Sequence, residues 1–124
     1  MKNFNFRRFA ALAAASAMAS MPIAAFAHGK LESATPASGS TVEVAPDVLR
    51  LSFNEDLEPT FSSVKIADAT GAPVTKEKAK VEASDPRVMT LAVPKLSSGV
   101  YTVQWAVMTA DAHKTKGTYT FKVK

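Results

Sequence analysis

The sequence predicts a small all-β domain, a sandwich of two sheets with about seven strands, that follows a cleaved leader. Three observations predict it. Residues 28–124 alternate apolar and polar side chains with a period of two, and helical periodicity is absent there. Turn-forming residues separate the alternating runs. The first 27 residues have the composition of a signal peptide instead.

Residues 1–27 have the three parts of a secretory signal peptide. Three basic residues and no acid stand in the first eight positions, an Ala-rich apolar stretch follows over 9–26, and Ala25-Phe26-Ala27 ends it with a small-x-small cleavage signature. An uncleaved membrane anchor is the alternative, because the stretch approaches the roughly 20 apolar residues that span a bilayer. Two serines and a proline interrupt it, however, so we expect cleavage after Ala27 and a mature domain over 28–124.

The net charge of the domain is much smaller than that of the whole chain once the leader is removed. The whole chain of 124 residues has a net charge of +4, but residues 28–124 carry 12 basic and 11 acidic side chains, a net charge of +1. This balance predicts no polybasic surface and no nucleic-acid partner. We therefore expect an exported periplasmic domain that is not embedded in the membrane. It has no cysteine, so burial alone must stabilise it.

Strict alternation marks four runs of the mature chain, over residues 49–53, 64–66, 101–107 and 119–123. In each run the odd or the even positions are apolar, as in strands with one face on a core. The predicted core gathers such positions: Leu31, Leu49, Leu51, Phe53, Val64, Ile66, Met89, Leu91, Val93, Tyr101, Val103, Trp105, Tyr119, Phe121 and Val123. The stretch 76–80, rich in lysine, is expected to be a solvated loop or sheet edge.

The mature domain has two histidines, and the first is His28. After cleavage at Ala27 it becomes the N-terminal residue, whose α-amine and Nδ1 can chelate one metal ion. Nitrogen donors in a plane suit Cu(II), which stands at the top of the divalent affinity order. The alternative is that a histidine follows the cleavage site by chance.

The second histidine, His113, follows Asp111 with one residue between them, after the 101–107 run. In an extended or turning segment this spacing directs both side chains to one side. An imidazole and a carboxylate at one place indicate a metal site, whereas an ordinary turn with an exposed histidine is the alternative.

Several motifs of the mature chain, taken in order, resemble the CopC/PcoC-type periplasmic copper-binding proteins, and more closely their short single-domain YobA-like members. The resemblance covers the whole of 28–124. The motifs that carry it are His28-Gly29-Lys30-Leu31, Thr35-Pro36-Ala37, Gly39-Ser40, Leu51-Ser52-Phe53-Asn54-Glu55, Phe61-Ser62, the run from Gly99 to Trp105, Asp111 to Gly117, and Phe121 to Lys124.

The resemblance implies an Ig-like Greek-key β-sandwich or barrel that binds one Cu(II) per mature chain. Carried over by residue, His28 supplies its amine and imidazole, His113 its imidazole, and Asp111 an axial or hydrogen-bonded carboxylate. Glu55 occupies the family's Glu position, where it either contacts the metal or orients a ligand. The resemblance also implies a CopD-like inner-membrane copper protein as a partner. A methionine-rich Cu(I) loop is missing, since the mature part has only Met89 and Met108.

The leading interpretation is a periplasmic carrier or sequestering chaperone for Cu(II), acting in copper homeostasis and resistance and not an enzyme. One alternative is a copper-dependent oxidative enzyme with an N-terminal histidine brace, although 97 residues leave little surface for a substrate platform. Another is an adhesive sandwich with incidental metal affinity. Tight stoichiometric binding without turnover favours the carrier, and peroxide production or glycan cleavage favours the enzyme.

Overall fold

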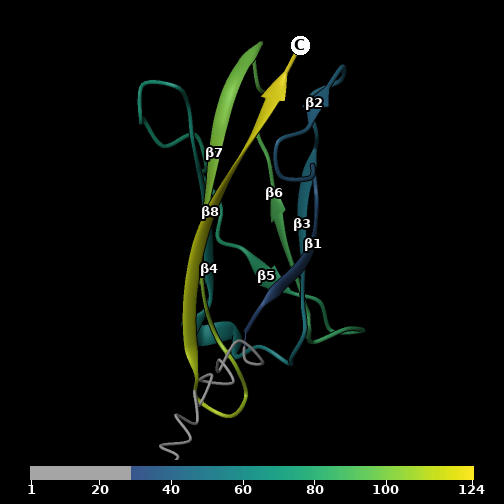
Figure 1. Ribbon diagram of the computed structural model, residues 1–124, viewed down its shortest axis with the longest axis vertical. Helices are drawn as coiled ribbons and strands as arrows, with labels where there is room; N and C mark the ends of the chain where they lie inside the picture. Colours follow the sequence, from purple (N-terminus) through teal and green to yellow (C-terminus); the bar gives the residue numbers. More distant parts are fainter. Residues whose placement is uncertain (1–28) are drawn as a thin grey trace, which may run out of the picture.

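The computed structural model describes residues 29–124, and these form two β-sheets packed face to face (Figure 1). The predicted signal peptide and His28 lie outside the described residues. Within residues 29–124 no helix is long and apolar enough to cross a membrane.

Eight strands and one turn of 3-10 helix make up the fold, where the sequence predicted about seven strands. Two of the eight contain two residues each, too few to give a visible alternation. The elements are β1 (Leu31–Thr35), β2 (Thr41–Val42), β3 (Val48–Phe53), η1 (Pro59–Phe61), β4 (Ser63–Ala67), β5 (Lys80–Val81), β6 (Val88–Ala92), β7 (Gly99–Met108) and β8 (Lys114–Val123).

The first sheet has the strand order β1-β3-β6-β5, and the second has the order β2-β8-β7-β4. All neighbours are antiparallel except β2 and β8, which are parallel. The long β7–β8 hairpin dominates the second sheet, with a continuous register from Gly99↔Val123 to Met108↔Lys114. It runs along the whole sandwich, so its loop and the C-terminus lie at opposite ends (Figure 1).

The core lies between the sheets and consists of the apolar positions that alternation predicted. Twelve of the fifteen predicted core residues are buried, while Leu31, Val93 and Trp105 are partly buried and pack against them. Trp105 lies at 5.2 Å from Phe53, ring centre to ring centre, in an edge-to-face contact. Four further apolar residues are buried, two of them at strand positions and two outside any strand: Leu57, Val88, Leu96 and Val107.

The lysine-rich stretch 76–80 behaves as the sequence predicted. Lys80 begins β5, which is an edge strand of the first sheet, and residues 76–79 lie outside the strands. Charged side chains on such an edge oppose pairing with another chain.

Candidate metal centre

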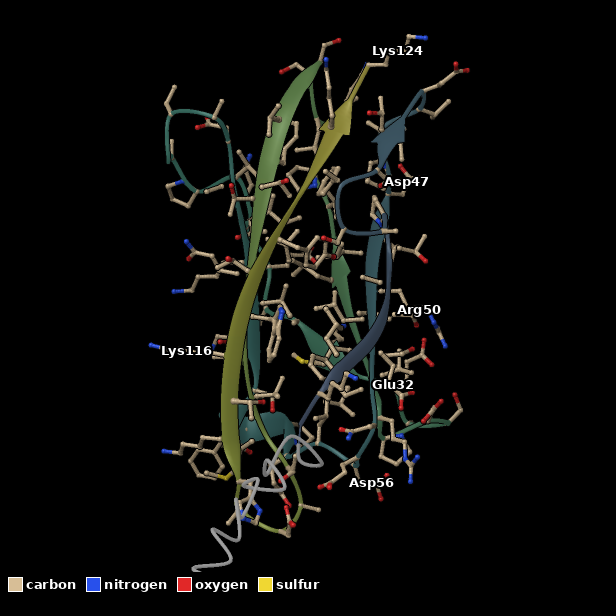
Figure 2. All side chains as sticks on the ribbon, viewed as in Figure 1. Glu32, Asp47, Arg50, Asp56, Lys116 and Lys124 are labelled. Carbon is tan, nitrogen blue, oxygen red and sulfur yellow. The ribbon has the colours of Figure 1, made fainter. Side chains whose placement is uncertain are left out.

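Three segments that are far apart in the sequence meet at the end of the sandwich where the β7–β8 loop lies. Asn54 and Lys30 exchange two hydrogen bonds, from Asn54 N to the Lys30 carbonyl (3.0 Å) and from Lys30 N to Asn54 Oδ1 (2.8 Å). On the other side, Ala110 N donates to the Asp56 carbonyl at 2.9 Å. The segment after β3 therefore joins the start of the described chain to the loop. Asp56 marks this end in Figure 2.

The loop between β7 and β8, residues 109–113, is closed by its own hydrogen bonds. Thr109 N donates to the His113 carbonyl, and Ala112 N donates to the Thr109 carbonyl, both at 2.9 Å. The turn requires a left-handed residue, and Ala112 takes that conformation with φ of +68°. The two ends of the loop are thus held together, and the residues between them have little room to move.

This geometry brings the sequence-predicted pair Asp111 and His113 into contact. Asp111 Oδ2 lies 3.0 Å from His113 Nδ1, and both side chains are about half exposed, at 47% and 55%. A carboxylate on one ring nitrogen fixes the orientation of an imidazole and leaves the other ring nitrogen to face a metal. The nitrogen that would bind a metal in this arrangement is Nε2.

The side chain of Thr109 bonds to both residues of this pair, and the sequence alone did not indicate this role. Its side chain is completely buried. Its hydroxyl donates to Asp111 Oδ1 and accepts from His113 N at 3.2 Å. The available signal was a threonine two residues before an aspartate in a turn, a pattern in which the hydroxyl often bonds to nearby backbone.

The first described residue, Gly29, lies against the same loop. Thr115 Oγ1 donates to the Gly29 carbonyl at 2.7 Å. A Cβ on Gly29 would lie 2.5 Å from Thr115 Oγ1 and 3.3 Å from Thr109 Cγ2, and its φ of +63° is one that side chains disfavour. Glycine is therefore required here for two separate reasons, namely its backbone conformation and the close approach of the threonines.

Glu55 is half-buried between Asn54 and Asp56, so it belongs to the segment that lies beside the loop. Across residues 29–124, however, no three side chains of histidine, cysteine, aspartate or glutamate gather as a metal site would require. The described part of the chain thus supplies the Asp111–His113 pair, with Glu55 on the neighbouring segment. His28 lies outside the described residues.

Comparison with known proteins gives a consistent result. A family model described as the CopC domain matches residues 31–124. Protein YobA of Escherichia coli strain K12 is 37% identical over 100 residues, 80% of this chain and 81% of YobA. Copper resistance protein C of Pseudomonas syringae pv. tomato is 36% identical over 104 residues, 79% of this chain and 82% of that relative.

A solved structure agrees with the fold. The crystal structure of CopC from Methylosinus trichosporium OB3b matches with a TM-score of 0.74 and 38% sequence identity, over 78% of this chain and 94% of that chain. The two chains therefore share their fold, and their sequences are similar as well.

Proposed function

Since the chain belongs to the CopC family, as its sequence motifs predicted, we propose that it is a copper-binding protein that carries or sequesters copper in copper homeostasis and resistance. The observation that carries the proposal is the Asp111–His113 pair, held on buried Thr109 at the end of the sandwich where the described chain begins. The relatives named above include a copper resistance protein, and none is named as an enzyme.

The proposed cargo is one Cu(II) per chain. His113 would supply Nε2, because Asp111 engages Nδ1, and Asp111 would act by orienting the ring. His28 would supply its α-amine and imidazole after the leader is removed. Gly29 is fixed against Thr109 and Thr115, and the residue before it is one Cα step of about 3.8 Å away. Nitrogen donors from two histidines and one amine suit Cu(II).

Glu55 is the fourth proposed group. Its neighbours Asn54 and Asp56 bond to Lys30 and Ala110, so the backbone around Glu55 is fixed on both sides. We assign Glu55 a weaker role than the histidines, either on the metal or on one of its ligands. The place of action would be the periplasm, and the receiving partner a CopD-like inner-membrane copper protein.

Cu(II) titration of protein purified from the periplasm, together with its intact mass, tests this function. We expect a chain that starts at His28 and binds one Cu(II). His113→Ala and Asp111→Ala should weaken binding without unfolding the domain, and Glu55→Ala should weaken it less. Asp47→Ala is the matched control, because Asp47 is an exposed carboxylate at the other end of the sandwich (Figure 2).

The N-terminal part of the proposal has its own test. Protein with one extra residue before His28 should bind Cu(II) far more weakly, since the α-amine is then an amide. Equal affinity of the two forms would contradict the chelate, and an unchanged Cu(II) spectrum in His113→Ala would contradict the loop as a ligand.

A further inference from the structure

The outer face of the second sheet is basic, which the net charge of +1 did not predict. Four lysines stand at outward, exposed positions of its strands, one on β4 and three on β8: Lys65, Lys114, Lys116 and Lys122. The positions between them are small or neutral, such as Ser63, Gln104 and Thr118. In Figure 2, Lys116 points away from the sandwich on this side. We call this surface the lysine face.

The strands that form the lysine face contain no acidic residue, and Glu77 borders it from a loop beside Lys65. None of the 11 acidic residues of the mature chain belongs to β2, β4, β7 or β8. Among residues 29–124, the ion pairs join Arg50 to Glu82, Arg87 to Asp56, His113 to Asp111 and Lys124 to Glu43, and none includes a lysine of this face. None of its four lysines therefore forms a direct ion pair with a described carboxylate.

The outer face of the first sheet, in contrast, carries side chains of both charges. Its outward Arg50 is paired with Glu82, and Glu32 on β1 adds a negative charge to that side (Figure 2). The two faces of one sandwich thus carry different charge, which the near-neutral total conceals. Such segregation favours one orientation in an electric field or against a charged surface.

An exposed aromatic ring lies at one end of the lysine face. Phe61 on η1 is 62% exposed. It borders a shallow hollow whose wall includes Ala106, Lys114 and Lys116. An apolar ring beside lysines is the combination that peripheral proteins present to the headgroups of a bilayer.

We propose that the lysine face binds the surface of a bilayer rich in anionic phospholipid, with Phe61 at the headgroup boundary. A flat array of lysines suits a diffuse negative surface. A protein partner fits less well, because protein interfaces are enriched in tyrosine, tryptophan and arginine and depleted in lysine. The strands of this sheet contain no arginine, and both of their tyrosines are buried. Trp105 is partly buried and lines a hollow with Lys65 and Lys116.

This orientation would have a consequence for the metal centre. Lys114 follows His113 directly, and Met108 precedes Thr109, so the β7–β8 loop forms one end of the lysine face. A domain lying on the bilayer by this face would hold its loop near the membrane surface. Binding to lipid itself does not depend on copper, so it can be tested on metal-free protein.

Vesicle sedimentation at low ionic strength tests the proposal. The protein should bind vesicles of phosphatidylglycerol mixed with phosphatidylcholine and be released by salt. The variant Lys65→Gln/Lys114→Gln/Lys116→Gln/Lys122→Gln should lose affinity by about 600-fold, at roughly fivefold for each lysine. The same four lysines changed to arginine should retain binding, and Phe61→Ser should weaken it to a smaller extent.

The matched control removes the same number of charges from the side of the first sheet, as Lys30→Gln/Arg50→Gln/Lys80→Gln/Arg87→Gln, and should keep most of the binding. All variants carry the same N-terminus, so a contribution from residues 1–28 cancels. Equal losses in both quadruple variants, or equal binding to pure phosphatidylcholine, would overturn the proposal. Retention on heparin without vesicle binding would indicate that the face binds an acidic macromolecule, and it would likewise contradict the proposed binding to a bilayer.

Discussion

Thr109 shows how much of the proposed metal centre depends on one neutral side chain. Its buried hydroxyl bonds to the Asp111 carboxylate and to the backbone N of His113. A hydrogen bond to a charged group contributes more than one between neutral groups, and the buried Thr109 hydroxyl that makes this one is shielded from solvent. Thr109 therefore positions both members of the pair before any metal arrives.

We expect Thr109→Val to lower Cu(II) affinity by about 10- to 100-fold, as for other partners that orient a ligand. Valine keeps the shape but removes the hydroxyl, so the cost to folding should be about 1 to 3 kcal/mol. Thr109→Ser keeps the hydroxyl and should retain most of the affinity. Cu(II) titration of the three proteins measures this, and equal affinity for Val and Ser would show that the hydroxyl does not position the pair.

Tyr119 differs from Thr109, because its buried hydroxyl has no hydrogen-bond partner among the described residues. Burial raises the pKa of Tyr119 to about 12. Because the folded state keeps the proton more tightly than the unfolded state, titration of this group leaves the stability of the fold unchanged below about pH 10. Stability is then lost as pH rises from about 10 to 12, where the unfolded state ionises first.

Tyr119→Phe should therefore raise the free energy of unfolding at neutral pH by about 1 kcal/mol, since it removes a polar group that burial leaves unsatisfied. It should also reduce the loss of stability between pH 9 and 12, by an amount on the order of 1 to 2 kcal/mol. Tyr101→Phe is the control, because the Tyr101 hydroxyl donates to the Ser97 carbonyl at 2.7 Å and its removal should destabilise. Denaturant melts across pH measure both, and a less stable Tyr119→Phe would contradict this account.

At the scale of elements, the β7–β8 hairpin and the segment before β1 determine where the metal centre lies. The hairpin register continues up to the pair Met108 and Lys114, so only the five residues 109–113 lie between the two strands. Gly29 is fastened to Thr115, the second residue of β8. The proposed metal centre is thus attached to one of the two longest strands of the second sheet on one side and to the start of the first sheet on the other.

Gly29→Ala should weaken Cu(II) binding by about tenfold, because a Cβ there meets Thr115 Oγ1 and strains a backbone with φ of +63° by about 1 to 2 kcal/mol. Gly39→Ala is the matched control. It has a φ of +73° but nothing within 4 Å of its Cβ, so it carries the backbone strain without the contact. Cu(II) titration and thermal melts of both variants separate the two effects. Equal affinity in the two would exclude the contact as the cause.

Much of the element pattern was predictable, because alternation depends only on which side chains face the core. Phe53, Ile66 and Phe121 were assigned correctly on that ground. The parallel pairing of β2 with β8 was not predictable, since two residues carry no period. Asp111 and His113 were found together because their spacing is local. Thr109 was missed because its role depends on burial, which arises only when the sheets pack.

For the whole molecule, we expect the separation of the proposed metal centre from the core to determine the response to acid. Imidazoles and amines bind copper only when unprotonated, so protons compete with the metal as pH falls. The hydrophobic core consists of aliphatic and aromatic residues together with Met89, with no histidine or carboxylate among its described members. Acid therefore acts on the loop end and not on the packing between sheets.

We expect Cu(II) affinity to fall as pH drops from 7 to 5, while the fold persists. Copper occupancy and far-UV circular dichroism followed on one sample measure both quantities. Simultaneous loss of copper and of the β signal would attribute release to unfolding. An affinity that does not change with pH would show that the proposed nitrogen ligands are wrong.

The length of β8 makes the two ends of the chain unequal as attachment points. β8 has ten residues at about 3.3 Å each, so it carries the chain about 30 Å from the loop to the far end of the sandwich (Figure 1). A tag, dye or second domain joined after Lys124 would begin at that distance and leave the loop open. Immobilising the protein through Lys124 on a sensor surface would present every molecule with its loop outward, so that copper exchange with a partner in solution can be timed directly.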